Sequence, residues 1–317
     1  MPVTRDEVIY AYRLLLGREP ESEIVIENTM AARDWLQLRE AFLASQEFIG
    51  KYESQAAHVL PVGRFFDVPE IPVDPRCTDE QLQLMFDRIA AAWKIFGETE
   101  PHWSVIVSDD FRQANLADNI DRFYLSGRGD IDVHLNFLAR AGLPTRFGRA
   151  LDFGCGVGRL TLALAAHADQ VVGVDISPPH LALAAERAEA QGIGNAAFES
   201  IDSVADLDRY GDLDFIISRI VLQHNPPPVM AALYRRLLTA LKPGGVAIVQ
   251  IPTYIQGQNF TAADYLANEQ PSMEMNALPQ KLVFEIIAET GCVPLEIRED
   301  SAAGHIGLSH TFAVQKA

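Results

Sequence analysis

From about residue 149 to its end, the chain alternates short apolar runs with segments of helical spacing. Strands separated by helices of roughly ten to fifteen residues are typical of βαβ units, whose strands lie parallel in one sheet. The alternation predicts an α/β fold with a doubly wound, mainly parallel, seven-stranded sheet. The expected strands are residues 150–153, 171–174, 196–199, 213–218 and 246–251, followed by two more near the C-terminus, and the expected helices are residues 159–167, 178–191, 226–241 and 279–290.

The turn after the first expected strand is rich in glycine and reads LDFGCGVGR, residues 151–159. Glycine takes positive φ at little cost and lets a ligand approach the backbone closely. The dinucleotide fingerprint G-x-G-x-x-G would need a glycine where Arg159 stands, which disfavours an NAD-dependent enzyme, and no Walker-type Gly-Lys-Ser/Thr follows. Asp175 ends the second strand, where a carboxylate can accept hydrogen bonds from both hydroxyls of a ribose. The alternative is a purely structural strand-to-helix turn.

Asp152, the G-x-G-x-G loop and Asp175 together resemble the Rossmann-like (class I) S-adenosylmethionine-dependent methyltransferases. The resemblance covers roughly residues 101–317 and includes the runs IDS at 201–203, DFIISR at 214–219, VLQH at 221–224 and LKPGG at 241–245. It implies S-adenosylmethionine as the cofactor and a hydroxyl or amine of a small molecule as the methyl acceptor. The cofactor is a sulfonium and an ammonium without phosphate, so acidic groups and carbonyls near the loop suit its charge.

The resemblance also implies roles for single residues. Asp152 would orient the methionine end through the loop or a water, Asp175 would hold the ribose, and Asp202 would meet the adenine amine unless it is a solvated loop acid. The run FYLSG at 123–127 is either an ordinary helix-end turn or a flap over a bound ligand. The expected cofactor-binding residues are Tyr124, Gly127, Asp152, Gly154, Cys155, Gly156, Arg159, Asp175, Ile176, Asp202, Ser203 and Arg219.

Methyl transfer is an in-line displacement, for which an enzyme mainly supplies alignment and desolvation, and a hydroxyl acceptor also gains from a general base. His224 is the expected catalytic residue, because it follows the fourth strand at the sheet edge where open α/β folds bind ligands. A capping or packing histidine is the alternative. His305 and His310 are expected to be structural. No His, Asp and Glu cluster has convincing ligand spacing, so no metal is expected.

A long polar stretch, residues 252–277, interrupts the alternation after the fifth strand. Such insertions are often lids or binding loops. Its Tyr254, Asn259, Phe260 and Tyr265 are expected to stack on and hydrogen-bond a sugar or a similar polar acceptor. A variable surface insertion is the alternative.

The first fifty residues differ from the rest of the chain. Thr4 and Glu7 form a capping-box pattern before a segment of helical spacing, and no cluster of catalytic residue types follows. We expect residues 1–56 to be a helical packing or docking unit, residues 57–100 a linker (57–77, rich in proline) and a connecting helix, and residues 101–317 the methyltransferase domain. The runs LLLGREP and FLASQEF resemble a bacterial domain family of unknown function that often accompanies surface-glycan enzymes. That resemblance implies a protein partner and makes a glycan intermediate a candidate acceptor.

Charge narrows the range of partners. The chain carries 26 Lys and Arg against 43 Asp and Glu, a formal net charge of −17. Such a surface repels phosphate backbones and anionic lipid heads, so nucleic acid and membranes are not expected partners. The three cysteines lie far apart, acidic residues stand where a signal peptide has its apolar run, and no segment approaches the roughly 20 apolar residues of a membrane span. A cytoplasmic location is expected.

The leading interpretation is therefore a cytoplasmic methyltransferase of a small polar acceptor. Methylation of another small molecule or of a lipid-linked intermediate is the nearest alternative. The alternative of a different class is a non-catalytic cofactor-binding or scaffold protein, which the helical extension would suit.

Overall fold

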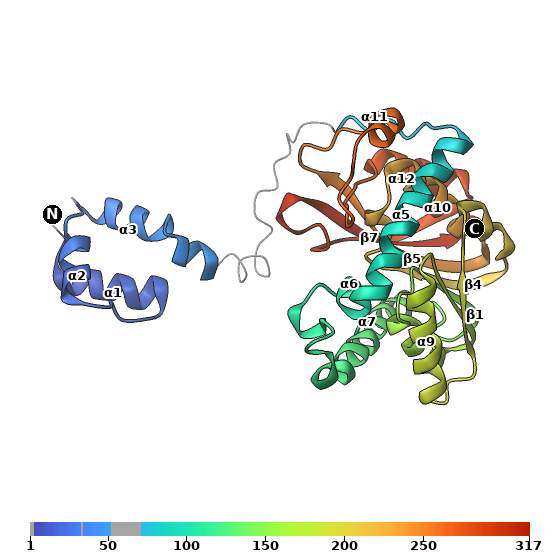
Figure 1. Ribbon diagram of the computed structural model, residues 1–317, viewed down its shortest axis with the longest axis horizontal. Coiled ribbons are helices and arrows are strands. Elements are labelled where there is room, and N and C mark those ends of the chain that lie inside the picture. The colour runs from blue at the N-terminus through green and yellow to red at the C-terminus, as the bar shows by residue number, and fades with distance from the viewer. Residues whose placement is uncertain (1–2, 33, 52–70) are drawn as a thin grey trace. The chain divides into compact units, whose positions relative to one another are not determined.

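The computed structural model describes residues 3–32, 34–51 and 71–317. The chain divides into two compact units, Met1–Pro69 and Glu70–Ala317 (Figure 1). Each unit has a hydrophobic core of its own. Of the predicted linker, residues 57–70 lie outside the described part of the chain.

Over its described residues, 3–32 and 34–51, the first unit is helical, as predicted. Its helices are α1 (Arg5–Ala11), continued by a π-helical turn (Tyr12–Leu16), then α2 (Glu23–Met30) and α3 (Trp35–Leu43). Thr4 and Glu7 form the expected capping box, in which the Thr4 backbone N–H donates to Glu7 Oε2 at 2.6 Å. Gly17 ends the first helical segment with a φ of 60°. The apolar faces meet in a small core of Val3, Val8, Leu16, Ile26, Leu38 and Phe42.

The second unit contains the predicted seven-stranded sheet, whose strand order is β3-β2-β1-β4-β5-β7-β6. The first five strands pair in parallel, and β7 and β6 pair antiparallel at one edge. The order reverses between β1 and β4, which creates the crevice where open α/β sheets bind ligands. The strands are β1 (Phe147–Phe153), β2 (Ala168–Asp175), β3 (Ala196–Ser200), β4 (Leu213–Ser218), β5 (Leu241–Ile255), β6 (Cys292–Asp300) and β7 (Gly307–Lys316).

Helices cover both faces of this sheet, which confirms the doubly wound arrangement (Figure 1). In β4, Phe215 and Ile217 face the core on one side of the sheet, whereas Ile216 faces the core on the other side. Burial on both faces explains why the strands are apolar throughout instead of alternating. The helices are α5 (Asp79–Thr99), α6 (Pro101–Val105), α7 (Ile120–Arg140), α8 (Arg159–Leu164), α9 (Pro178–Ala190), α10 (Pro227–Thr239), α11 (Ala262–Ala267) and α12 (Gln280–Glu289).

Helix α5 belongs to the second unit, so the expected domain start at residue 101 differs from the division of the structure. Met85 and Phe86 are almost fully buried in the main core. Arg88 fixes the helix further, because its Nη1 donates to the carbonyls of Tyr265 at 2.8 Å and Asn268 at 3.0 Å. The sequence predicts this helix, but not the surface that its apolar face covers.

The stretch at residues 252–277 is mostly not a lid. β5 runs on to Ile255, and α11 follows. Phe260 and Tyr265 are buried in the main core, so these two residues do not present their rings to a ligand as expected. Tyr254 is partly buried and Asn259 is exposed. The buried rings of Phe260 and Tyr265 instead hold this stretch against the core.

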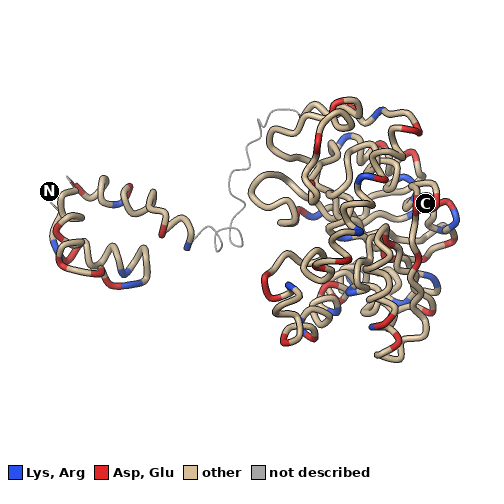
Figure 2. Tube along the Cα trace, viewed as in Figure 1, with Lys and Arg blue, Asp and Glu red and all other residues tan. Residues whose placement is uncertain are grey.

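No described helix has both the length and the apolarity that crossing a membrane requires. Lys and Arg are scattered among Asp and Glu along the trace of each unit (Figure 2).

Candidate functional site

The glycine loop joins β1 to α8 and lies in the crevice of the sheet. Gly154 and Gly156 have φ of 73° and 51°. A Cβ on Gly154 would lie 2.3 Å from the Val221 side chain, and one on Gly156 would lie 2.6 Å from Val105. Both the backbone angles and the close neighbours therefore exclude larger residues at these two positions.

Asp175, at the end of β2, holds this loop in place. Its Oδ2 accepts the Gly156 backbone N–H at 2.8 Å, and its Oδ1 accepts the Ser177 backbone N–H at 2.9 Å. The side chain is buried, yet it lines the pocket above the loop. Each carboxylate oxygen has two lone pairs, so both oxygens can still accept a hydrogen bond from a ligand.

We call this cavity the loop pocket; it encloses about 660 Å³ of space, including its open mouth. Five of the predicted cofactor-binding residues line it, namely Gly154, Gly156, Asp175, Ile176 and Arg219. Helices α5 and α6 supply the opposite wall. Its remaining lining residues are Phe86, Ile89, Trp93, Ser104, Val105, Phe153, His180, Ile220, Val221, Asn225 and Leu233.

Neither Asp152, near the end of β1, nor Cys155, within the loop, is among the residues lining the pocket. Thr161 Oγ1 donates to Asp152 Oδ2 at 2.6 Å, and burial raises the pKa of Asp152 to about 6. Burial also raises the pKa of the Cys155 thiol. Asp152 therefore supports the start of α8 from below, which agrees with an indirect role and not with direct ligand contact.

Asp202 and Ser203 follow β3, and neither is among the residues lining the pocket. The Asp202 and Ser203 backbone N–H groups both donate to Asp206 Oδ2, at 2.7 and 3.0 Å. The Asp202 side chain is exposed. Its contact with an adenine amine stays a prediction, and the arrangement equally suits the solvated loop acid.

The run 123–127 is neither a helix-end turn nor a flap, because it lies inside α7. Tyr124 is buried, and its hydroxyl donates to the Val157 carbonyl at 3.3 Å. A Cβ on Gly127 would lie 2.3 Å from the Arg159 carbonyl oxygen. This glycine therefore allows α7 and α8 to pack closely, and Tyr124 contacts the glycine loop through its hydrogen bond to Val157.

Three charged residues, Arg159, Asp130 and Arg219, form a cluster at the edge of the site next to α7. Arg159 Nη1 lies 2.6 Å from Asp130 Oδ2, and Arg219 pairs with the other oxygen of the same carboxylate. Burial acts to raise the pKa of Asp130, but Arg219 and Arg159 outweigh it and hold the pKa below its usual value. Two guanidiniums share one carboxylate, so the cluster carries one net positive charge. Asp130 is missed by sequence reasoning, since no local pattern marks it.

His224 is buried beside the loop pocket but does not line it. Its Nδ1 lies 2.8 Å from the Glu274 carbonyl and must donate to it, which leaves Nε2 as the acceptor, 3.4 Å from Gln223 Nε2. Burial lowers the pKa of His224. The imidazole is thus neutral, as a base must be, but both nitrogens already have protein partners. Its ring centroid lies 5.2 Å from that of Trp93.

A second buried histidine, His180, is missed by sequence reasoning. Its Nδ1 lies 2.7 Å from Ser177 Oγ and its Nε2 lies 2.9 Å from Ser104 Oγ. Ser177 Oγ in turn donates to the Trp93 carbonyl at 3.1 Å. This network ties α9, α6 and α5 together around the pocket. The Ser177-to-His180 spacing at the start of α9 is a local signal, whereas its partners come from distant segments.

His305 lies in a short 3₁₀ turn, and His310 lies in β7 with its Nδ1 2.9 Å from Thr253 Oγ1. Across residues 3–32, 34–51 and 71–317, no group of three or more His, Cys, Asp or Glu could hold a metal ion.

Comparisons with known proteins agree with this geometry. Residues 150–245 match the family model described as a methyltransferase domain. Trans-aconitate 2-methyltransferase of Methylobacterium nodulans is 34% identical over 138 residues, which are 43% of this chain and 50% of the relative. A ubiquinone biosynthesis O-methyltransferase of Xanthomonas campestris pv. campestris is 34% identical over 116 residues, 36% of this chain and 46% of that one. The chain spans about half the length of the curated relatives it matches.

The solved structure of magnesium protoporphyrin IX methyltransferase from Synechocystis PCC 6803, with bound S-adenosylhomocysteine, shares the fold. It is 20% identical with a TM-score of 0.51, and the match covers 72% of this chain and all of that one. Together these findings agree with the predicted methyltransferase domain over residues 150–245 and with the predicted fold. The pocket residues fit the expected cofactor, S-adenosylmethionine, because the backbone of the loop lines the pocket and Asp175 offers acceptors to a ribose.

Proposed function

We propose that this chain is an S-adenosylmethionine-dependent methyltransferase that methylates a small polar acceptor. The observation that carries the proposal is Asp175, whose two oxygens organise the glycine loop and also line the loop pocket. Cytoplasmic location, and docking of a protein partner by the helical unit, are parts of the same proposal.

Bound S-adenosylmethionine supplies a methyl carbon activated by its sulfonium sulfur. The protein's own residues would hold and orient it: Asp175 would accept hydrogen bonds from the ribose hydroxyls, the backbone at Gly154 and Gly156 would face the methionine end, and Asp202 would meet the adenine amine. Apolar side chains of the pocket, among them Phe86 and Ile176, exclude water from the reacting groups. Alignment and desolvation are the main contributions that methyl transfer asks of a protein.

Calorimetry with S-adenosylmethionine, S-adenosylhomocysteine and NAD tests the cofactor. We expect saturable binding of both adenosyl compounds and none of NAD, because Arg159 replaces the glycine that a pyrophosphate-binding loop needs. Saturable NAD binding without a response to either adenosyl compound would contradict the proposal.

His224→Asn tests the predicted general base. With both ring nitrogens bonded within the protein, the packing alternative is favoured, so we expect a lower melting temperature and nearly normal turnover and cofactor affinity. Catalysis by this imidazole would instead make turnover fall by about 10²–10⁴-fold in a folded variant and rise with pH through the His224 titration in the wild type. Turnover of the wild type and variant is compared at several pH values.

The acceptor is less constrained than the cofactor. The two relatives above are named for trans-aconitate and for O-methylation in ubiquinone biosynthesis, which favours an oxygen acceptor. A glycan intermediate is supported only by the resemblance of the helical unit. A non-catalytic binding protein is the remaining alternative, and it predicts S-adenosylmethionine binding without turnover on any acceptor.

A further inference from the structure

A second cavity lies next to the loop pocket and shares Arg219 and Ile220 with it. We call it the acceptor pocket. It lies between α7 and the β5, β7 and β6 part of the sheet, and it encloses about 1290 Å³ of space, including its open mouth. A molecule in this pocket would reach the loop pocket at Arg219 and Ile220.

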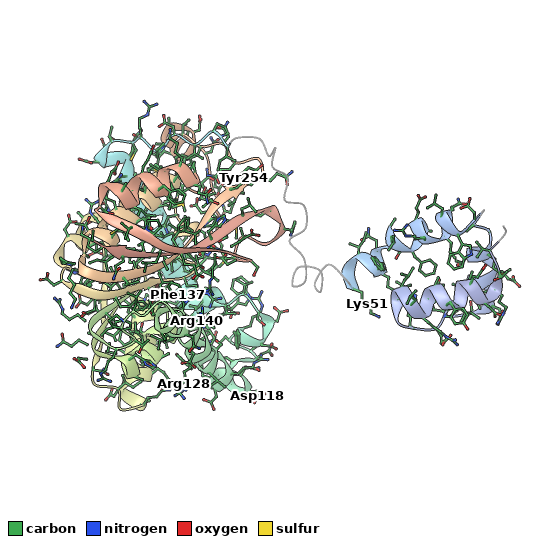
Figure 3. The ribbon with its side chains drawn as sticks, turned by 180° about the vertical axis from the view of Figure 1, so that it is seen from behind. Lys51, Asp118, Arg128, Phe137, Arg140 and Tyr254 are labelled. Carbon is green, nitrogen blue, oxygen red and sulfur yellow. The ribbon has the colours of Figure 1, made fainter. Side chains whose placement is uncertain are left out.

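One side of α7 forms a wall of the acceptor pocket. Asp130, His134 and Phe137 line the pocket at spacings of four and three residues, so they follow one another along the same side of the helix. Phe137 lies on the side of α7 next to the sheet (Figure 3). Arg219 pairs with Asp130 at one end of this row. At the other end, the Arg298 guanidinium carbon lies 5.6 Å from the Phe137 ring centroid. His134 therefore occupies the middle of the wall.

The imidazole of His134 is half-buried, yet no group among the described residues hydrogen-bonds to it. Burial, together with the charge of Arg219, lowers the pKa of His134 to about 4, so the ring is neutral at neutral pH. A neutral imidazole carries one N–H donor and one nitrogen lone pair. His134 can thus accept a hydrogen bond from a ligand, unlike His224, whose two ring nitrogens are bonded within the protein.

The charges of the lining restrict what the acceptor pocket can take. Next to the loop pocket, Asp130 is shared by Arg219 and Arg159, so this end carries one net positive charge. Over the whole lining, four carboxylates face two guanidiniums, namely Asp130, Glu296, Glu299 and Asp300 against Arg219 and Arg298. The positive end repels a protonated amine, and the negative lining as a whole repels an acid. An uncharged hydroxyl compound is subject to neither repulsion.

Arg219 can hold the oxygen of such a hydroxyl. Its Nη1 engages Asp130, and its guanidinium has no second hydrogen-bond partner in the described part of the chain, so further N–H donors remain. Its side chain is 38% exposed and lines both pockets, where an acceptor must meet the cofactor. N–H donation to the oxygen stabilises the negative charge that develops as the proton leaves. This assistance matters because His134 is a weak base.

We propose that His134 is the general base for an uncharged hydroxyl acceptor, whose oxygen Arg219 holds beside the cofactor. This inference rests on the proposed function. The hydroxyl oxygen attacks the methyl carbon of S-adenosylmethionine, a C–O bond forms as the C–S bond breaks, and the electron pair of the C–S bond stays on sulfur. The hydroxyl proton passes to the free ring nitrogen of His134, which releases it to solvent through the open mouth of the pocket. The products are a methyl ether and S-adenosylhomocysteine.

The first test needs neither an acceptor nor a variant. Diethyl pyrocarbonate modifies neutral imidazoles, and peptide mapping by mass spectrometry locates them in the full chain. We expect the rate at His134 to stay nearly constant from about pH 7.5 to 5.5, because its lowered pKa keeps the ring neutral. The rate for N-acetylhistidine in the same solution should fall by about tenfold, since its pKa is about 6.5. A His134 that resists modification, or whose rate falls as steeply, contradicts the inference.

The second test is turnover by the full chain with S-adenosylmethionine. The hydroxyl probes are methyl glucoside, inositol, catechol and phenol, and the charged probes are succinate and butylamine. We expect a methyl ether from at least one hydroxyl probe and no product from the charged ones. His134→Gln should lower kcat for that probe by about 10²–10⁴-fold. The KM of the probe and the S-adenosylhomocysteine affinity should change little, because glutamine keeps a donor and an acceptor and His134 lies outside the loop pocket. Imidazole added to His134→Ala should restore part of the turnover, which a merely structural role would not allow.

His305→Gln is the matched control, because His305 is exposed and lines neither pocket. The inference is overturned if no hydroxyl probe is methylated, or if the acid or the amine is methylated instead. Normal turnover by folded His134→Gln, or no recovery of His134→Ala by imidazole, would overturn it as well. Failure of S-adenosylhomocysteine itself to bind would instead refute the proposed function.

Discussion

Asp175→Ala is expected to weaken S-adenosylhomocysteine binding by roughly 100-fold or more. A hydrogen bond to a charged group contributes about 1.5–3 kcal/mol, and two ribose hydroxyls would lose such a bond. The variant also removes the acceptor of the Gly156 and Ser177 backbone N–H groups, so the loop loses its fixed position. Calorimetry on the folded variant measures the change.

Two further variants separate the effect of the lost charge from a general effect of substitution on this strand. Asp175→Asn keeps an acceptor oxygen but loses the charge, so its affinity should lie between those of the wild type and Asp175→Ala. Asp169→Ala is the control, because Asp169 lies exposed on the same strand and pairs with Arg146. Unchanged affinity in folded Asp175→Ala would mean that another group holds the ribose.

Asp130→Ala should have the largest effect on stability, lowering the free energy of unfolding by about 3–5 kcal/mol. The reason is Arg159, whose side chain is only 9% exposed and would be left charged with no carboxylate partner, only the Ser126 hydroxyl 3.2 Å from its Nη1. Its Nε already lacks a hydrogen-bond partner in the structure. Urea denaturation at neutral pH measures the loss, and the double variant Asp130→Ala/Arg159→Met should recover much of it.

Asp121→Ala is the surface control for this prediction. Asp121 also lies on α7 and pairs with an arginine, but its side chain is 94% exposed, so the variant should change stability by less than about 1 kcal/mol. The pKa of Asp130 is lowered in the folded chain, so its contribution is present above the ordinary carboxyl pKa and is lost as pH falls through the lowered value. The difference between wild type and Asp130→Ala should therefore shrink in acid. Equal stability of the two proteins at neutral pH would show that Arg159 is not held by this carboxylate.

The sheet and its crevice were predictable from the sequence, because strand–helix alternation and the glycine spacing are local patterns. Asp175 follows from the same logic, since its place at the end of β2 is set by chain order. The burial of the aromatic residues after β5 was harder to predict. Phe260 and Tyr265 sit in a polar stretch that looks exposed, yet both are buried by contacts with segments far away in the chain.

The errors in the run 123–127 have a related cause. Gly127 interrupts an otherwise helical pattern, and a glycine there suggests a helix end. A glycine is needed here because a Cβ on residue 127 would lie 2.3 Å from the carbonyl oxygen of Arg159, which belongs to another helix. Asp130 was missed similarly, because its two arginines are brought together only by packing. The sequence alone therefore predicts helices and strands well, and contacts between side chains of distant segments poorly.

The walls of the two pockets have different origins along the chain. The glycine loop and Asp175 lie within residues 150–245, the segment that matches the methyltransferase domain model. Helices α5, α6 and α7 and the strands β6 and β7, which complete both pockets, lie outside it. The matched segment therefore supplies the glycine loop and Asp175, whereas the segments outside it form the facing walls. A chimera that carries these outer segments on the sheet of a related protein should keep the loop and change which molecules can bind against it.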